Sequence, residues 1–371
     1  MSGQPATLSR RALNRALLAR QMLLERVDLP PEAAIERLLG LQSQIPGNPY
    51  VALWSRLNDF DAEAVSELTQ SRKLVRIALM RGTLHLVTVR DALMLRPVVQ
   101  KVFERNMTPG SVYGRALASI DMAALMRTGR RLVEEKPRSN RELADALAPH
   151  FPDRDGHALS QAVRAVLPLV QVTPRGLWRR GGLAISTTIE SWTGETLSGD
   201  DAPDATILRY LAAFGPASVT DMQAWSGLTR LAGAVARLRP QLTEFRDEDG
   251  RVLYDLPDAP RPGEDGEAPA RFLPDYDNAL LGHDDRRRVI DDGHRLHFKK
   301  QNGLLPAFLI DGRVAGSWRL DRDKGAATLS ISPLATLGRK DRAALSRGAE
   351  ALLAFHEPDA RTRDIRFADA P

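Results

Sequence analysis

The sequence predicts an α+β fold built around a repeated unit, and three observations lead to this prediction. Apolar residues recur at helical spacing over most of the first 240 residues, and three groups of short helices are each followed by two β-prone runs that flank a turn. The last part of the chain has several β-prone runs and one long helical pattern. Three short helices closed by a hairpin are the outline of a winged helix. We therefore predict three tandem winged-helix units followed by a small, β-rich α+β layer.

The first predicted unit covers residues 1–115. Residues 10–72 have apolar positions at helical spacing, and one helix is predicted over residues 33–41. Two β-prone runs, 73–80 and 83–87, flank Arg81-Gly82, which is typical of a tight turn. The sequence therefore predicts helices followed by a hairpin.

The second predicted unit covers residues 116–190. Its middle helix begins with the capping box Ser139-x-x-Glu142, in which two side chains and two backbone N–H groups satisfy each other. The remaining expectations are helices over residues 122–135, 139–150 and 157–170, and a hairpin with strands over 169–173 and 177–185 around a turn at 174–176.

The third predicted unit covers residues 203–258, and a C-terminal subdomain covers residues 271–371. Linkers are expected at residues 187–203 and 258–270, because proline, glycine and acidic residues interrupt the periodic pattern there. The third unit should have helices over 206–214, 220–225 and 230–238 and a hairpin of 242–246 with 252–256. The C-terminal subdomain should have strands within 289–329, a helix over 339–355 and a strand over 365–367.

The composition restricts the function. The chain has 371 residues, no cysteine and seven histidines, so disulfides, thiolate metal sites and a cysteine nucleophile are excluded. We predict that no metal or cofactor is needed. No long uncharged apolar run or signal-peptide pattern is found, so we expect a cytoplasmic protein. We also expect it to be associated with the nucleoid and to be a monomer, since three winged units can cover a binding site without a second copy.

The basic residues favour a polyanionic partner. The net charge is +5, and the 52 basic residues are 45 arginines and 7 lysines. Arginine binds phosphate through two parallel hydrogen bonds, which indicates a nucleic acid. The alternative is an arginine-rich coding background without functional meaning.

The most informative motif is Gln42-Ser43-Gln44, which stands between an apolar helix and a turn rich in proline and glycine. In extended backbone, residues two positions apart lie on the same face, so the two amides could hold one water between them. Each amide offers donors and an acceptor and does not titrate. The sequence therefore predicts that Gln42 and Gln44 are catalytic. The alternative is helix C-capping and turn hydrogen bonding, with no role in chemistry.

Several basic residues are predicted to contact DNA. Arg81 and His85 lie on the first hairpin, and the alternative for them is a wing turn and a half-buried strand histidine. Arg286, Arg287 and Arg288 would form a phosphate clamp or a solvated charge run. Arg179 follows Trp178, for which core packing and a stacking wedge are both considered.

Four stretches of the sequence resemble the AlkZ/YcaQ family of winged-helix DNA glycosylases. They are residues 39–50 (LGLQSQIPGNPY), 81–87 (RGTLHLV), 214–217 (FGPA) with Asp221 and Trp225, and 273–283 (LPDYDNALLGH). The resemblance spans nearly the whole chain. Its most specific element is the Gln-x-Gln motif of the AlkZ branch, which implies that Gln42 and Gln44 are the catalytic residues.

The resemblance implies a monofunctional glycosylase that releases N7-alkylguanine, including bulky or crosslinked adducts, from duplex DNA and leaves an abasic site. It also implies a role in self-resistance to genotoxic natural products. An N7-alkylated guanine is already cationic and leaves without a general acid, so two amides that position a water suffice. The alternative function is a winged-helix regulator or lesion sensor that binds DNA without catalysis. An RNA-binding role has little support, because no RNP-like aromatic motif is present.

Overall fold

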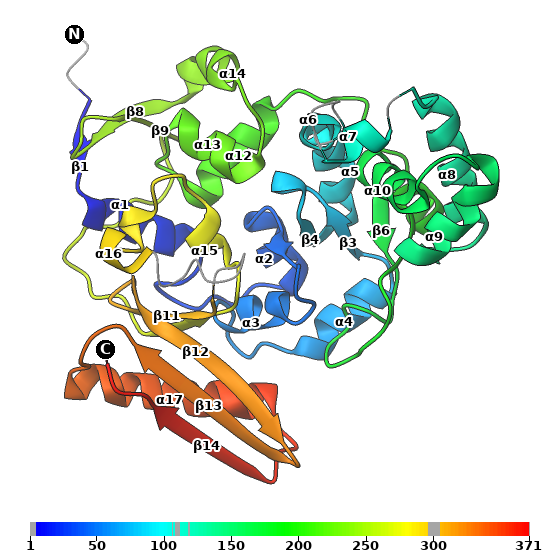
Figure 1. Ribbon diagram of the computed structural model, residues 1–371. Coiled ribbons are helices and arrows are strands. Elements are labelled where there is room, and N and C mark those ends of the chain that lie inside the picture. Colours follow the sequence, from blue (N-terminus) through cyan, green and yellow to red (C-terminus); the bar gives the residue numbers. More distant parts are fainter. Residues whose placement is uncertain (1–4, 106, 108–111, 118, 296–304, 371) are drawn as a thin grey trace.

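The computed structural model describes residues 5–105, 107, 112–117, 119–295 and 305–370, and it shows the mixed α+β fold that the sequence predicts. In these residues the strands form three sheets, of six, five and three strands. Helices of the first two predicted units lie around the six-stranded sheet, and the five-stranded sheet lies apart from it at the C-terminal end of the molecule (Figure 1).

The first predicted unit contains the expected helices and hairpin. The predicted tight turn at Arg81-Gly82 is present as a short 3-10 segment between two antiparallel strands. Side chains of Ser9, Asp61 and Thr88 accept N-terminal backbone hydrogen bonds of three helices, which fixes where these helices begin. The helices are α1 (Arg10–Arg20), α2 (Pro31–Arg37), α3 (Asn48–Trp54), α4 (Ala62–Gln70), α5 (Val89–Val98), α6 (Gln100–Arg105) and α7 (Val112–Ala116). The remaining elements are β2 (Leu41–Gln42), β3 (Leu74–Ala78), η1 (Met80–Gly82) and β4 (Leu84–Thr88).

The second unit has the predicted capping box, in which Ser139 and Glu142 bond each other's backbone. Its helices are α8 (Met122–Glu135), α9 (Asn140–Leu147), α10 (Gly156–Val166) and α11 (Ile189–Thr193), with the short η2 (Ala148–His150). Its strands are β5 (Arg138–Ser139), β6 (Leu169–Gln171) and β7 (Ile185–Thr188). Strands β3 and β6 pair antiparallel, so the hairpins of the first two units form one sheet in the order β2-β4-β3-β6-β7-β5.

The third unit also has its predicted helices and hairpin. Its elements are α12 (Asp204–Phe214), α13 (Val219–Ser226), α14 (Ala232–Leu238), η3 (Arg239–Gln241), β8 (Thr243–Asp247) and β9 (Val252–Asp255). The sequence analysis did not anticipate β1 (Thr7–Leu8), which pairs with β8 in parallel and ties the N-terminal end to this hairpin. Ser218 and Asp221 form a second capping box at the start of α13.

The C-terminal subdomain is a sheet with one long helix on it, as predicted. The helix α17 (Arg339–His356) packs against the sheet through Leu345, Ala349 and Leu352. The sheet contains β10 (Arg271–Leu273), β11 (Ala307–Ile310), β12 (Arg313–Asp323), β13 (Ala326–Pro333) and β14 (Thr362–Phe367) in sequence order. Between β10 and β11 lie α15 (Asn278–Leu281), η4 (Arg286–Arg288) and α16 (Asp292–Arg295).

Two expected helix ends and one expected strand were wrong. The helix expected over residues 33–41 ends at Arg37, because Leu39 and Gly40 have positive φ angles of 57° and 90°. The helix expected to reach residue 170 ends at Val166, shortly before Pro168. The strand expected over 177–185 is instead part of a loop over 172–184, and β7 extends into the predicted linker at 187–203. The loop is set by tertiary contacts, since Trp178 packs on Tyr50 and Phe355.

The cores are shared between the units to different degrees. Leu125, Leu143, Leu159 and other residues of the second unit form a cluster of their own. The largest cluster combines side chains of the first and third units with residues of α15. The boundaries 1–115, 116–190, 203–258 and 271–371 therefore remain a prediction about the chain's organisation.

Among the described helices, none is both long and apolar enough to cross a membrane.

Candidate active site

The backbone before Gln42 brings the motif from a helix into the edge of the six-stranded sheet. After α2, Leu39 and Gly40 turn the chain, and Leu41 and Gln42 pair with β4. A Cβ atom at Gly40 would lie 2.4 Å from Cγ1 of Val87, so only glycine fits this turn. Gln42 is thus in extended backbone, and the helix C-cap is Leu38. The alternative that Gln42 and Gln44 cap a helix does not hold.

Gln42 is buried and its amide has a defined partner. The residue is 6% exposed, and its Oε1 accepts a hydrogen bond of 2.9 Å from Nη2 of Arg81. A guanidinium group is only a donor, so the oxygen of the carboxamide must face Arg81 and the nitrogen must face away. The Arg81 contact therefore fixes which atom of Gln42 is available for chemistry.

Gln44 has a different environment. It lies in the bend between β2 and α3, and it is exposed, as is the neighbouring Ile45 at 44%. In the described part of the chain, the Gln44 side chain makes no hydrogen bond. The motif therefore combines one fixed, buried amide with one that is accessible from solvent.

Ser43, between the two amides, is anchored by Arg76 of β3. Arg76 donates from Nε to Ser43 Oγ at 2.9 Å and from Nη2 to the Ser43 carbonyl oxygen at 2.6 Å. Its third nitrogen, Nη1, donates to Oε1 of Gln171 on β6. Burial lowers the pKa of Arg76 to about 10, with a smaller effect of Arg175, so the group remains charged at neutral pH. Arg76 thereby ties the motif to both the first and the second hairpin.

His85 lies opposite Gln42 in the antiparallel pairing of β2 with β4. It is 2% exposed, and its Nδ1 lies 2.9 Å from the carbonyl oxygen of Thr83. Burial, together with the charge of Arg81, lowers the pKa of His85 to about 3, so the imidazole is neutral at physiological pH. Because a carbonyl only accepts, Nδ1 carries the proton and Nε2 is an acceptor. As placed, the side chain is buried rather than presented to DNA.

Residues 273–283 contact the chain just before and just after the motif. Asn278 donates from Nδ2 to the carbonyl oxygens of Leu38 and Gly40, at 3.2 and 2.8 Å. Asn48, at the start of α3, donates to the carbonyl oxygen of Asp275 at 2.7 Å. Burial raises the pKa of the Asp275 carboxyl group. The turn before Gln42 and the helix after Gln44 are therefore both attached to this segment.

The third unit reaches the motif through α13. Arg81 Nη1 donates to the carbonyl oxygen of Trp225, near the end of this helix. At the start of α13, Asp221 accepts backbone hydrogen bonds from Asp284 and Asp285, which follow the 273–283 segment. Parts of the chain that are far apart in sequence thus converge around Gln42.

The three arginines that were predicted to clamp a phosphate, Arg286–Arg288, mostly contact other groups of the protein. Arg288 is 5% exposed and donates to the carbonyl oxygen of Pro216, so it is directed into the protein. Arg287 bonds Asp249 and Asp285, which raises the pKa of Arg287 and lowers the pKa of both carboxyl groups. Arg286 lies close enough to Arg81 for its charge to lower the pKa of Arg81, after the larger effect of burial. The three side chains therefore do not face the surface as one group.

The acidic groups beside Arg287 are the one cluster of potential metal ligands among the described residues. The cluster consists of Asp247, Asp249 and Asp285. Arg251 and Arg287 make ion pairs with these carboxylates. The guanidinium groups satisfy the negative charge, so the cluster is explained as an ion-pair network.

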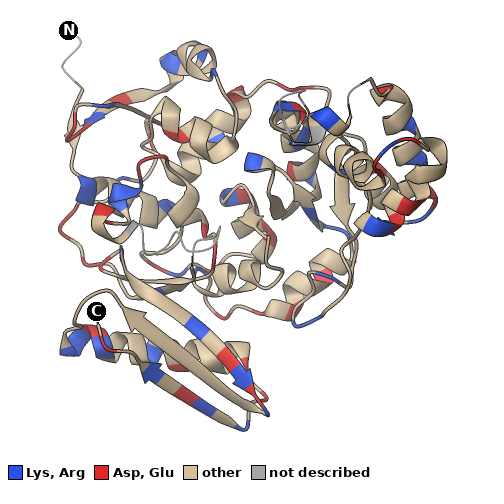
Figure 2. Ribbon diagram, in the orientation of Figure 1, with Lys and Arg blue, Asp and Glu red and all other residues tan. Residues whose placement is uncertain are grey.

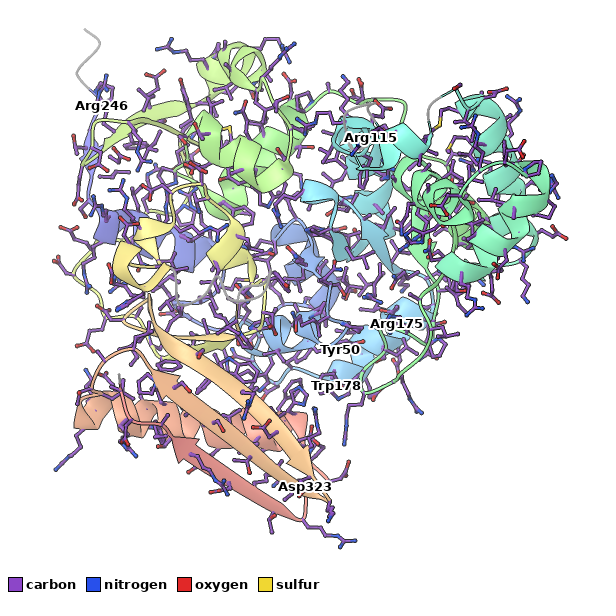
Figure 3. All side chains as sticks on the ribbon, in the orientation of Figure 1. Tyr50, Arg115, Arg175, Trp178, Arg246 and Asp323 are labelled. Atoms are coloured by element: carbon purple, nitrogen blue, oxygen red, sulfur yellow. The ribbon has the colours of Figure 1, made fainter. Side chains whose placement is uncertain are left out.

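Trp178 is a packing residue in the loop after β6. Its ring centroid lies 4.9 Å from that of Tyr50 and 4.9 Å from that of Phe355 in α17. Figure 3 shows Tyr50, Trp178 and Arg175 close together where this loop meets the first unit. The next residue, Arg179, is exposed and pairs with Asp359 at 2.8 Å. Of the two alternatives for Trp178, core packing applies.

The sequence analysis missed Arg76 and Asn278. A charged residue inside the apolar run of β3 was a signal for Arg76, since buried arginines need several acceptors. Asn278 lies in a stretch that resembles the family, but nothing local indicated its partners, which are backbone carbonyl oxygens 238 and 240 residues away in sequence. Basic and acidic residues are interspersed along much of the ribbon (Figure 2).

Comparisons with known proteins show the family and the fold of this chain. The family model of AlkZ-like DNA glycosylases matches residues 35–355, which include the motif and every segment that braces it. An interstrand DNA cross-link repair glycosylase from Streptomyces sahachiroi is 24% identical over 348 residues, covering 82% of this chain and 85% of that protein. The solved structure of Streptomyces sahachiroi DNA glycosylase AlkZ superposes with a TM-score of 0.80 at 20% identity, covering 98% of this chain and 100% of that chain, and so shares its fold. The chain described here belongs to the family of AlkZ-like DNA glycosylases.

Proposed function

We propose that this DNA glycosylase hydrolyses the N-glycosidic bond of N7-alkylguanine in duplex DNA, with Gln42 and Gln44 as the catalytic residues. The observation that carries the proposal is the uncharged amide of Gln42, which is held in a partly enclosed position. Its amide is fixed by Arg81, its cross-strand neighbour His85 is neutral, and Gln44 is accessible two residues later.

The proposed reaction needs no general acid. N7-alkylation gives the guanine a positive charge, so cleavage of the C1′–N9 bond moves the bonding electron pair onto the base and releases it as a neutral molecule. A water then forms the new C1′–O bond and loses its proton to solvent. The amides position this water and stabilise the positive charge that develops on the sugar. Unmodified guanine is a poorer leaving group, which restricts the reaction to alkylated bases.

The product is proposed to be an abasic site, without strand cleavage by the enzyme. A bifunctional glycosylase needs an amine nucleophile that forms a Schiff base with the sugar. In the described part of the chain, the cationic side chains that contact residues 42–44 are Arg76 and Arg81, not lysines. Guanidinium groups stay protonated at neutral pH and do not serve as such nucleophiles.

Bulky and crosslinked adducts are the proposed physiological substrates. The relative from Streptomyces sahachiroi is named as an interstrand cross-link repair glycosylase, which supports this class. Gln44 and Ile45 are exposed, so the Gln44 end of the motif lies at the protein surface. We propose that the motif approaches the sugar from the minor groove without base flipping, since a crosslinked base is difficult to flip. A rise in 2-aminopurine fluorescence beside the lesion on binding would contradict this approach.

Contact with the DNA backbone is proposed for Arg179, Arg286 and Arg287, which the structure leaves at least partly exposed. His85 and Arg288 are buried and are omitted from this proposal, although the sequence suggested them. We further propose that the enzyme acts as a monomer at the nucleoid and protects its host against genotoxic natural products.

The test is single-turnover base release from a duplex that carries one N7-alkylguanine, with Gln42→Ala and Gln44→Ala compared with the wild type. Both variants should lose most of the rate, on the order of 100-fold for a removed transition-state contact, and should still bind DNA. Gln70→Ala is a matched control, because Gln70 is an exposed glutamine at the end of α4.

Two results would contradict the proposal. Absence of release by the wild type from both small and bulky N7 adducts would leave a DNA-binding protein without this activity. Release that is equally fast in the wild type and in both variants would place the catalytic groups elsewhere.

A further inference from the structure

We infer that Arg81 is a positioning residue that fixes the orientation of the Gln42 amide, so that Gln42 presents N–H donors and Gln44 presents the acceptor to the reacting water. This inference deepens the proposed function and depends on it for the identity of the reaction. It assigns to Arg81 a role other than phosphate contact.

The first step is the placement of Arg81. It lies in η1, between β3 and β4, with φ of 57°, which is uncommon for a residue with a side chain. The backbone of Gly227, which ends α13, packs directly on this turn: a Cβ atom at Gly227 would lie 3.1 Å from Cα of Arg81. The third unit thus holds the turn in its conformation.

The second step is the direction of the guanidinium group. Nη1 donates to the Trp225 carbonyl oxygen, and Nη2 donates to Gln42 Oε1 at 2.9 Å. The planar fork can make both bonds only in one orientation, and neither can be reversed because arginine has no acceptor. Without Arg81, the terminal amide of Gln42 could rotate by about 180° and exchange its oxygen and nitrogen.

The third step is the consequence for the water. With its oxygen bonded to Arg81, Gln42 directs its Nε2 group away from the arginine, and this group donates no hydrogen bond within the described residues. A nucleophilic water is held by a donor to one of its lone pairs and by an acceptor for the hydrogen bond of one O–H group, while the second lone pair faces C1′ and the proton is later lost to solvent. Gln42 supplies the donor, and the unengaged amide oxygen of Gln44 supplies the acceptor.

The experiment combines kinetics with a direct probe of the amide. Single-turnover release at saturating enzyme is measured for Arg81→Ala, Gln42→Ala and the double variant. We expect Arg81→Ala to slow release by about 10- to 100-fold, with little change in the DNA dissociation constant. In the Gln42→Ala background, the same substitution should cost less than about 2-fold, because its effect passes through Gln42.

A conservative and a matched control variant accompany these. Arg81→Lys retains a donor and a charge, and should recover part of the rate that Arg81→Ala loses. Arg105→Ala is the control, because Arg105 is an exposed arginine that donates to the carbonyl oxygen of Gly227 at the same turn, whereas the Gln42 amide bonds Arg81. Its rate should stay within about 2-fold of the wild type.

The probe of the amide is the pair of side-chain NH₂ signals of Gln42 in protein labelled with ¹⁵N-glutamine, assigned by their loss in Gln42→Ala. Arg81→Ala should shift these signals while those of Gln44 change less. Unchanged Gln42 signals would overturn the inference, as would an equal rate loss in both backgrounds or a loss seen only in DNA affinity. If the wild type releases no base, the proposed function fails, and the NMR signals still decide whether Arg81 holds the amide.

Discussion

The two halves of the Gln-x-Gln motif differ in how the protein holds them. Gln42 is buried in a strand, bonded by Arg81 and preceded by a turn that Asn278 braces. Gln44 is exposed in a bend, and its side chain has no partner in the described part of the chain. The comparison teaches that identical side chains two residues apart need not be equivalent. The Gln42 amide is oriented before the substrate binds, whereas the Gln44 side chain can adapt to the substrate.

The difference has a structural cause. The Gln42 side of the motif belongs to the six-stranded sheet and contacts the third unit and residues 273–283. The Gln44 side is connected to that segment through Asn48. The edge strand β2 is held by its pairing with β4 and by Asn278 at the turn before it, whereas the bend at Gln44 is exposed to solvent. We expect that substitutions on the Gln42 side have the larger effects.

The largest expected effect concerns the replacement of each glutamine amide by a carboxylate, which distinguishes a donor role from an acceptor role. Gln42→Glu keeps an oxygen for Arg81 but removes the N–H donors, so base release should fall by about 100- to 1000-fold. Gln44→Glu keeps the acceptor, so its rate should stay within about 10-fold of the wild type. Single-turnover release measures both. Equal losses in the two variants would show that the glutamines are equivalent.

The second prediction compares the glycines on either side of the motif. Gly40→Ala meets both a φ of 90° and a 2.4 Å approach to Val87, and should lower the free energy of unfolding by about 2 to 3 kcal/mol. Gly47→Ala is the matched control, because Gly47 has open space around it and helical backbone angles. Urea unfolding measures both variants. A stable Gly40→Ala protein would mean that the turn before Gln42 can adjust.

The third prediction concerns pH. Since the glutamines do not titrate, release corrected for spontaneous depurination should be nearly constant between about pH 6 and 9.

Stability should depend on pH through His85. Its folded-state pKa is about 3, below its ordinary value of 6.5, so between these two pH values the unfolded chain binds a proton that the folded chain does not. Its contribution to stability is present above pH 6.5 and is lost as the pH falls toward 3, by at most about 1.4 kcal/mol per pH unit.

Urea unfolding at pH 7.5, 6.5 and 5.5, with the wild type and His85→Asn, checks this dependence. The wild type should lose more stability than the variant over this range. An acidic limb in the rate profile, in place of the flat profile, would assign a catalytic role to a carboxyl group such as Asp275, whose pKa is raised by burial.

The smallest expected effect is at the surface, away from the motif. Arg179→Ala breaks an exposed ion pair with Asp359 and should change the free energy of unfolding by less than about 1 kcal/mol. If Arg179 contacts a phosphate, the salt dependence of DNA binding should fall by about one unit of slope, without loss of base release at saturating enzyme. An unchanged slope would remove Arg179 from the interface.

Much of the fold could be predicted because its signals are local. The capping box at Ser139, the turn at Arg81-Gly82 and the helix periodicity of α8 and α17 depend on residues within a few positions of each other. The strand expected at 177–185 was wrong, since burial of Trp178 against Tyr50 and Phe355 outweighs its β-propensity. The positions of Gln42 and Gln44 were readable from the motif, while the difference in their burial was not.

The sequence by itself determined the α+β class, the order of helices and hairpins, and the motif that marks the family, because these follow from periodicity, turn chemistry and local spacing. Only the tertiary structure decided that Arg81 bonds Gln42, that Arg76 anchors Ser43, and that Asn278 braces Gly40. These contacts join residues 33 to 238 positions apart, and a guanidinium or an amide can satisfy many acceptors. Which acceptor it meets is set by how the sheets and helices pack, and no local pattern encodes that choice.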